Sequence, residues 1–184
     1  RGPFCQSWVR FSRTWLMNDQ LPRVAWTPPC SDRSGCQLVP EASRAPLADV
    51  FAQALRERDP TATPEQAEQA REKAYRSPVL LLAVVDAERG DADIDLAERT
   101  VSAGCAVQNM LLMATALGYG SALTSGKALK ADSLRALVQL APAEVALCFV
   151  RIGPVLSRKA VRARPVASAY VSTLDASRGV VPGF

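Results

Sequence analysis

The stretch SAGCAVQNMLLMATALGYG, from Ser102 to Gly120, does most to decide the fold of this chain. With the residues before it, the stretch predicts one long helix over Leu96–Leu117, which the glycines at 118 and 120 end. From Ala103 to Leu117 the helix is apolar on nearly every side, and many of its residues are Ala or Gly. Such a helix should be buried on most sides, and small residues permit the close approach of a second helix.

Two shorter helices are predicted before it, one on each side of Asp59-Pro60. Ser43 is a candidate N-cap for the first, and Pro46 is tolerated in its first turn. The second begins at Thr63, where Pro64 and Gln66 complete the pattern of a capping box, and runs to about Arg76. The first helix shows one apolar face, formed by Leu47, Val50, Phe51, Ala54 and Leu55.

Two apolar runs, Val79–Val85 and Val145–Ile152, are predicted as buried strands. The acidic stretch 86–95 is expected to be a loop, 119–129 a polar loop, and 131–140 an amphipathic helix with Leu134, Leu137 and Val138 facing inward. A weak strand is expected over 169–174. The class is therefore α+β, with helices around a modest mixed sheet.

The length of 184 residues suits a single domain over 1–184. Residues 1–40 differ from the rest: they hold all three Trp, three of the five Cys and five of the thirteen Pro, without a sustained period. This N-terminal segment is therefore interpreted as an irregular extension.

The composition excludes several chemistries. With no His in the chain, Ser-His-Asp and Cys-His catalysis are ruled out. Five Cys without C-x-x-C spacing argue against a metal site or a disulfide framework, and a reduced, cytoplasmic protein is the default. Cys105 and Cys148 lie in apolar elements and are expected to be buried and inert. No side chain is predicted as a catalytic acid, base or nucleophile, so a cofactor that carries its own chemistry fits best.

The charges are segregated along the chain. Six acids and one Arg lie between Asp86 and Glu98, and five bases without an acid lie between Arg151 and Arg164. The simpler interpretation is that the acidic and the basic stretch are two solvated surfaces. The more specific interpretation is a phosphate site near the basic end. The net charge of +4 comes with no nucleic-acid-binding motif, and no stretch is apolar enough to span a membrane. Neither nucleic acid nor a membrane is therefore expected as a partner.

The glycines at 118–126 match neither a P-loop nor a dinucleotide fingerprint. By itself, the segment 119–127 is either a connection that caps the long helix or a loop that binds a ligand. Thr124 and Ser125 carry hydroxyls and Gly126 allows close backbone approach, so hydrogen bonds to a planar ring are possible.

Residues 74–153 resemble the nitroreductase family. The family pattern, approximately SAG-x-A-x-QN-x-x-LAA-x-x-LG-x-G, is matched almost throughout Ser102–Gly120. Leu123-Thr-Ser-Gly126 is similar to the loop that follows it in the family, and Phe149-Val-Arg-Ile-Gly153 to a late strand. The tail at 169–174 resembles the closing segment of small members, so the family-like part covers residues 41–174.

The resemblance implies a nitroreductase-like α+β homodimer with the long helix at its interface and FMN bound between subunits. By position, Leu123, Thr124 and Ser125 would contact the flavin. The stretch associated with NAD(P)H in close relatives corresponds to Met113, Ala114, Thr115, Ala116, Leu117 and Gly118. The implied activity is hydride transfer from NAD(P)H, through FMN, to a nitroaromatic, quinone or similar small-molecule acceptor. The alternatives are a flavin-deficient dimeric member without activity, and another flavin chemistry on the same fold, such as dehalogenation or flavin breakdown.

The N-terminus departs from the family pattern. Family members open with an Arg-Arg-Ser-like motif for the FMN phosphate, followed by W-A-P-[SN]-H-like and Q-P-W elements. Here Ala25-Trp-Thr-Pro28 resembles the second element, while Arg10 and Arg13 are poor matches for the first and Q-P-W is not found. A shifted reading frame upstream of Leu38 would explain this aberrant segment, and a divergent N-terminus is the alternative hypothesis.

Overall fold

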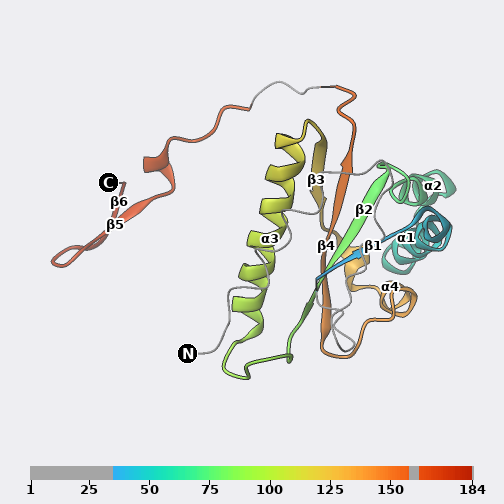
Figure 1. Cartoon of the computed structure of the whole chain (residues 1–184), viewed down its shortest axis with the longest axis horizontal. Coiled ribbons are helices and arrows are strands. Elements are labelled where there is room, and N and C mark those ends of the chain that lie inside the picture. The colour runs from blue at the N-terminus through green and yellow to red at the C-terminus, as the bar shows by residue number, and fades with distance from the viewer. Residues whose placement is uncertain (1–34, 158–161, 184) are drawn as a thin grey trace.

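The computed structural model describes residues 35–157 and 162–183. Its centre is a four-stranded sheet in the order β1-β2-β4-β3 (Figure 1). The strands are β1 (Gly35–Leu38), β2 (Val79–Asp86), β4 (Glu144–Gly153) and β3 (Gly120–Thr124). The α+β class is confirmed, and every described pair of neighbouring strands in this sheet is antiparallel, where a mixed sheet was expected.

Helices cover both faces of the sheet. α1 (Arg44–Arg58), α2 (Pro64–Glu72) and α4 (Asp132–Leu137) lie on one side, and α3 (Leu96–Ala116) lies on the other (Figure 1). The described residues also include three short 3-10 turns: η2 (Glu41–Ser43), η3 (Lys127–Lys130) and η4 (Ala167–Ala169). The resulting architecture has three layers, helix on sheet on helix.

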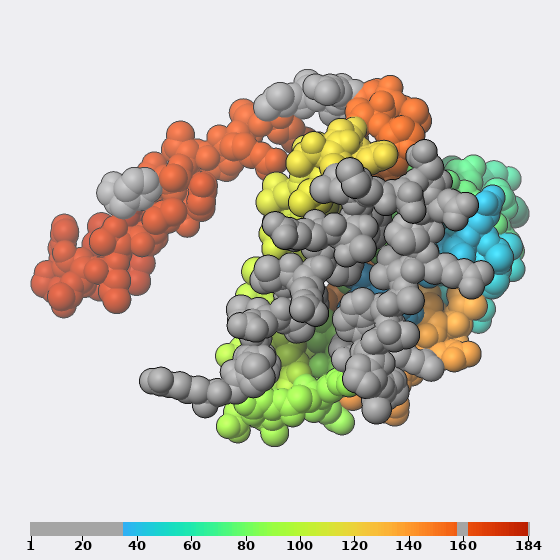
Figure 2. All heavy atoms as spheres, viewed as in Figure 1, coloured from blue at the N-terminus to red at the C-terminus, as the bar shows by residue number. Residues whose placement is uncertain are grey.

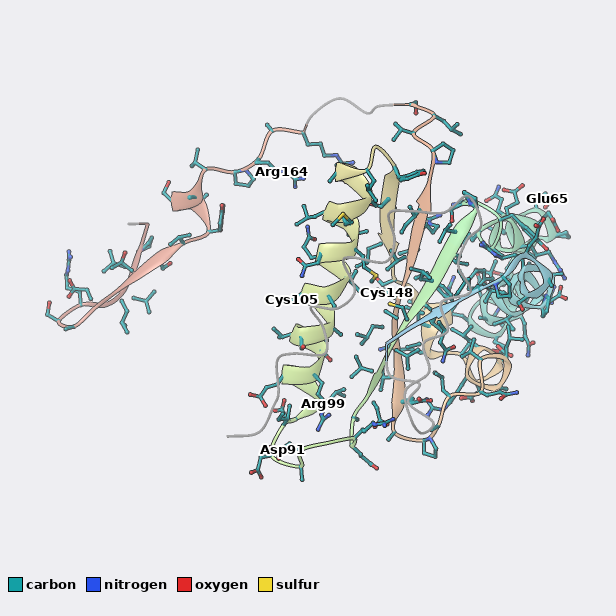
Figure 3. All side chains as sticks on the ribbon, viewed as in Figure 1. Glu65, Asp91, Arg99, Cys105, Cys148 and Arg164 are labelled. Atoms are coloured by element: carbon teal, nitrogen blue, oxygen red, sulfur yellow. The ribbon has the colours of Figure 1, made fainter. Side chains whose placement is uncertain are left out.

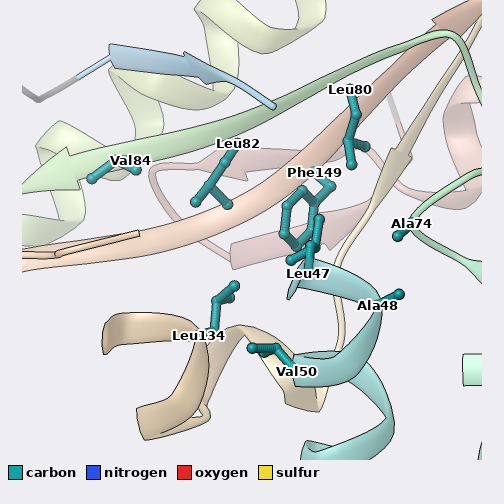
Figure 4. Packing of buried hydrophobic residues seen from close by; sticks show 9 residues of the cluster. All are labelled: Leu47, Ala48, Val50, Ala74, Leu80, Leu82, Val84, Leu134 and Phe149. Carbon is teal, nitrogen blue, oxygen red and sulfur yellow. The ribbon is translucent and has the colours of Figure 1, made fainter. Parts of the chain in front are cut away.

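The larger of two hydrophobic clusters joins α1 and α4 to the sheet. Leu47, Leu80, Leu82 and Leu134 are at most 2% exposed, and Phe149 packs beside them (Figure 4). The predicted apolar face of α1 is confirmed, because Leu47, Val50 and Ala54 are buried. In α4 only Leu134 is fully inward, since Leu137 is 36% exposed and Val138 is partly buried at the rim.

The two predicted helix starts differ in outcome. At α2 the capping box is complete: the Gln66 N–H donates to Thr63 Oγ1 at 3.3 Å, and the Thr63 N–H donates to Gln66 Oε1 at 2.9 Å. At α1 the Ser43 side chain makes no capping hydrogen bond, so that prediction is wrong. α2 also ends at Glu72, before the expected Arg76.

α3 has the predicted length and ends as expected. Gly118 has φ +83°, a left-handed conformation that glycine adopts without strain, and the Tyr119 N–H donates to the Ala114 carbonyl at 2.9 Å. Its burial differs from the prediction, because only Val107 and Ala114 are buried. One face packs on β2 and β4, and the other faces solvent. Cys105 is likewise exposed rather than buried, whereas Cys148 is buried as predicted.

The segment at 119–129, expected as a loop, contains strand β3 and turn η3. β3 pairs with β4 from Gly120 opposite Gly153 to Thr124 opposite Phe149. After β4, residues 162–183 form an arm that stands away from the body and carries a hairpin of β5 (Ser172–Asp175) and β6 (Gly179–Pro182) (Figures 1 and 2). The predictions for residues 1–34 lie outside the described residues.

Candidate functional site

A pocket of about 260 Å³ lies between α1, α2 and the turn that follows β3. Thr124, Ser125 and Gly126 form one wall. Apolar side chains of the main core form another, including Phe51 and Phe149, whose rings meet edge to face with centroids 5.5 Å apart. The pocket therefore contains two of the three residues expected at the flavin, beside an aromatic wall.

The strand pairing of β3 and β4 determines which side chains face this pocket. Side chains alternate along a strand, so Thr124 and Leu123 point to opposite faces of the sheet. Thr124 and Ser125 line the pocket, whereas Leu123 does not and is 50% exposed. Only the backbone of Leu123 is therefore placed to reach a ligand in this pocket.

Arg151, from the adjacent strand β4, is half-buried in the same pocket. Its Nη2 donates to Thr124 Oγ1 at 2.6 Å. Its Nε is buried and has no hydrogen-bond partner in the described part of the chain. A buried guanidinium N–H without an acceptor is costly, so Arg151 is a candidate to bind a group that enters the pocket.

The pocket is lined by five basic side chains and, among the described residues, by no Asp or Glu. The five are Arg58, Lys73, Arg76, Lys127 and Arg151. Lys73 and Arg76 follow the end of α2, and Lys127 begins η3. Their shared sign creates a positive field in a partly enclosed space, where charges are screened less than at an open surface.

Arg151 and Arg164, the two ends of the basic segment noted in the sequence, do not lie in one site. Arg151 lies in the pocket on the α1 and α2 side of the sheet. Arg164 lies on the arm, on the α3 side, well separated from α2 and its Glu65 (Figure 3). Arg151 and Arg164 are close in the sequence, but the fold places them in separate parts of the molecule.

The stretch expected to contact NAD(P)H, Met113 to Gly118, lies at the C-terminal end of α3. It precedes β3, whereas Thr124 ends that strand. Four residue steps in a strand span roughly 13 Å. Met113 and Leu117 are about half exposed, so this stretch presents an accessible apolar surface that the single chain does not bring against the pocket.

Sequence reasoning missed Lys73 and Arg76 as members of the pocket, and it considered Arg151 only as the first residue of the basic segment that ends at Arg164. For Arg151 a signal existed: it is the one charged residue within the apolar run VALCFVRI. A charge inside a buried strand needs a partner or a function. Nothing in the local pattern distinguishes Lys73 and Arg76 from ordinary surface residues of a helix end.

A second cavity, of about 460 Å³, lies on the other side of Ser125 and Gly126, against α4. Its Arg135 donates to the backbone carbonyls of Pro142 at 2.9 Å and Glu144 at 3.0 Å. Because Arg135 already donates to these backbone carbonyls, this cavity is the weaker candidate for a ligand site. Among the described residues there is no group of three or more potential metal ligands, and no helix long and apolar enough to cross a bilayer.

Comparison with known proteins gives a consistent result. The sequence model of the Nitroreductase family matches residues 36–154. No curated protein matches the chain. The match begins at Cys36, so the aberrant N-terminal segment lies almost wholly outside it.

Several solved structures share the fold. The nitroreductase-like family protein from Bacillus cereus aligns with a TM-score of 0.59 at 17% identity, over 76% of this chain and 73% of that one. Nitroreductase A from Vibrio parahaemolyticus gives 0.54 at 19% identity, over 74% and 55%. The NfrA1 nitroreductase from B. subtilis gives 0.55 at 14% identity, over 74% and 55%. These confirm the predicted nitroreductase-like fold.

Proposed function

Because this chain belongs to the nitroreductase family, we propose that it is an FMN-dependent oxidoreductase. The proposed reaction passes hydride from NAD(P)H to a nitroaromatic, quinone or similar acceptor. Family membership supports an oxidoreductase in general, and the cofactor, the hydride donor and the acceptors are proposals. The observation that carries them is the pocket at Thr124 and Ser125, which joins an aromatic wall to a set of cations.

The residues in this pocket fit FMN in chemical character. FMN has a flat ring system with apolar faces and a polar edge, and it carries a phosphate dianion. The apolar wall, with Phe51 and Phe149, suits the ring, while the Thr124 and Ser125 hydroxyls and the unpaired Arg151 Nε suit polar groups. The volume is just below the roughly 300–1,000 Å³ of small-molecule pockets, so other residues must enclose part of the ligand.

The roles proposed for the chain follow from these positions. Leu123, Thr124 and Ser125 hold the flavin, with Leu123 acting through its backbone. The stretch Met113–Gly118 contributes to the NAD(P)H site. When bound, FMN would supply the redox chemistry between the nicotinamide and the acceptor, while these residues of the protein would bind and orient the flavin and the nicotinamide.

A homodimer is the proposed assembly. The solvent-facing side of α3 carries Val101, Leu112, Met113 and Leu117, each at least 47% exposed. Apolar side chains gathered on one helix face favour a contact with another protein surface. A second copy packed there would bury this face, and it would enclose the part of the ligand that the pocket of one chain leaves exposed.

The first experiment is the visible spectrum of the purified chain after addition of FMN and removal of the excess. We expect a retained flavin band that NADH or NADPH bleaches under anaerobic conditions, and that a quinone or nitroaromatic restores. A colourless protein would instead favour the flavin-deficient alternative, for which the unmatched N-terminal segment is the reason. A bleached band that none of these acceptors restores would favour another flavin chemistry.

The variant Gly126→Leu tests whether this pocket is the flavin site. A Cβ at Gly126 meets no atom within 4 Å, and its φ of −179° is extended backbone, so the fold should accept the side chain. The added isobutyl group enters the pocket wall and should reduce FMN binding at least tenfold. Ala92→Leu adds an apolar side chain in an exposed loop and is the control. Equal FMN binding by both variants would place the flavin elsewhere.

A further inference from the structure

We propose that Arg151 is the centre of an oxyanion-binding site, which takes a phosphate or carboxylate group into the pocket between α1, α2 and η3. The inference needs no bound flavin, because it concerns the charges of the chain itself. It also differs from the phosphate site expected at the N-terminal Arg residues, which lie outside the described part of the chain.

The first step concerns the hydrogen bonds of Arg151. A guanidinium has five N–H donors and no acceptor. One of them, on Nη2, is directed to Thr124 Oγ1 at 2.6 Å, which fixes the plane of the group. Its Nε is buried without a partner, so the hydrogen-bonding capacity of this guanidinium is not satisfied within the described part of the chain. Arg in this arrangement favours planar, two-oxygen acceptors such as carboxylate and phosphate.

The second step concerns the charges around it. Lys73, Arg76 and Lys127 line the same pocket, and no ion pair joins any of them to a described carboxylate. Arg58 also lines it, although its charge acts on the neighbouring Asp59. Several unneutralised cations around one cavity repel each other, and an anion relieves that repulsion.

The third step concerns the occupant. The shared chemistry is an oxygen-bearing anion, which has two sources: the phosphate of FMN, or an anionic group on a substrate or on NAD(P)H. Neutral apolar ligands would leave the Arg151 Nε unsatisfied, so they are disfavoured. The two sources are separable by comparing FMN with riboflavin, which lacks the phosphate.

The test titrates inorganic phosphate into the full chain by calorimetry, at constant ionic strength maintained with chloride. Arg151→Met should weaken phosphate binding at least tenfold, because it removes charge-assisted hydrogen bonds. Arg151→Lys, which keeps the charge but loses the planar fork, should be intermediate. Lys130→Met changes the net charge equally at a residue outside this pocket, and it should bind phosphate as the parent chain does.

A second variant keeps the test decisive if Arg151→Met fails to fold. Lys127 is exposed at the pocket rim, so Lys127→Met should fold and weaken phosphate binding about threefold, a rim-charge effect. Equal phosphate binding by Lys127→Met, Lys130→Met and the parent chain would overturn the inference. The absence of phosphate binding to the parent chain would overturn it as well.

The flavin comparison identifies the source and separates this inference from the proposed function. If FMN phosphate is the occupant, Arg151→Met should abolish the preference for FMN over riboflavin. An unchanged preference, with phosphate binding lost, would assign the site to an anionic substrate or to NAD(P)H. If no flavin binds while Arg151→Met still loses phosphate, the inference stands and the proposed function fails. If flavin binds and is bleached but the chain does not bind phosphate, the proposed function stands and this inference fails.

Discussion

Arg44, the first residue of α1, is 4% exposed and connects three segments of the chain. Its guanidinium donates to the carbonyls of Val39 at 3.1 Å, Ala74 at 2.5 Å, Ser77 at 3.3 Å and Pro78 at 3.1 Å. Burial lowers the pKa of this Arg, the largest of its influences, while Glu41 and Tyr75 act in the opposite direction. It is therefore a structural cation that satisfies backbone acceptors before β2 begins.

Arg44→Met should lower the free energy of unfolding by about 3 kcal/mol, because several buried carbonyls lose their donor at about 1–3 kcal/mol each. Urea denaturation measures the loss. Arg56→Met, on the exposed surface of α1, is the control and should change stability by less than about 0.5 kcal/mol. Equal losses for the two variants would contradict the structural role of Arg44.

Asp175 closes the hairpin of the arm. Its carboxylate accepts from the Ser177 hydroxyl at 2.7 Å, and from the backbone N–H groups of Ser177 and Arg178. These bonds, with the Ser177 hydroxyl first, lower the pKa of Asp175 from 3.8 to about 2. Because the folded turn prefers the ionised form, its stabilisation is complete above pH 3.8 and is lost as the pH falls through about 2.

The amide signals of Ser177 and Arg178, followed by NMR in an acid titration, should therefore keep their folded positions at about pH 3 and move near pH 2. Asp175→Asn removes the titrating group, so those signals should lose this transition. A midpoint near the ordinary value of 3.8 would mean that the hydrogen bonds of this turn do not persist in solution.

At the scale of elements, the starts of α1 and α2 allow a matched comparison. Thr63→Ala removes a capping hydrogen bond and should lower stability by about 1 kcal/mol. Ser43→Ala removes a hydroxyl that caps nothing, so it should change stability by less than about 0.5 kcal/mol. Thermal and urea unfolding of both variants would check this. The reverse order would mean that Ser43, as its sequence position first indicated, is the real cap.

At the scale of the whole molecule, a substitution on the outer face of α3 tests the proposed homodimer. Leu112→Arg places a charge on this face, where Leu112 is 58% exposed in the single chain. The variant should remain folded and weaken self-association at least tenfold, as measured by sedimentation equilibrium. Gln53→Arg adds the same charge on α1, across the sheet, and should associate like the parent chain. A monomeric parent chain would exclude the proposed dimer.

Cys105 offers a second measurement of the same assembly. It is exposed on α3, whereas Cys148 in β4 is buried in the cluster that includes Val107 of α3, and this burial raises the pKa of its thiol (Figure 3). In the Leu112→Arg variant Cys105 should be alkylated fast and Cys148 slowly, with the sites assigned by mass spectrometry. In a dimeric parent chain, Cys105 should become protected as the protein concentration rises.

The sequence alone determined the features that a few neighbouring residues encode. Thr63 and Gln66 are three residues apart and predicted their reciprocal hydrogen bonds, because a helix start brings those positions together. Gly118 predicted the end of α3, since it adopts the left-handed conformation without strain. The apolar runs that became β2 and β4 were predicted for the same reason: a short run that is apolar on both faces needs no distant information.

The tertiary structure alone decided what depends on distant residues. The segment at 120–124 became a strand because β4 offered its free edge, which no pattern within that segment shows. α3 became buried on one face only, because a single sheet covers it. Thr124 acquired its charged neighbour in the same way, when strand pairing brought Arg151 against it, 27 residues away in the sequence. Local periodicity fixes which residues form an element, and only packing fixes what each face of that element meets.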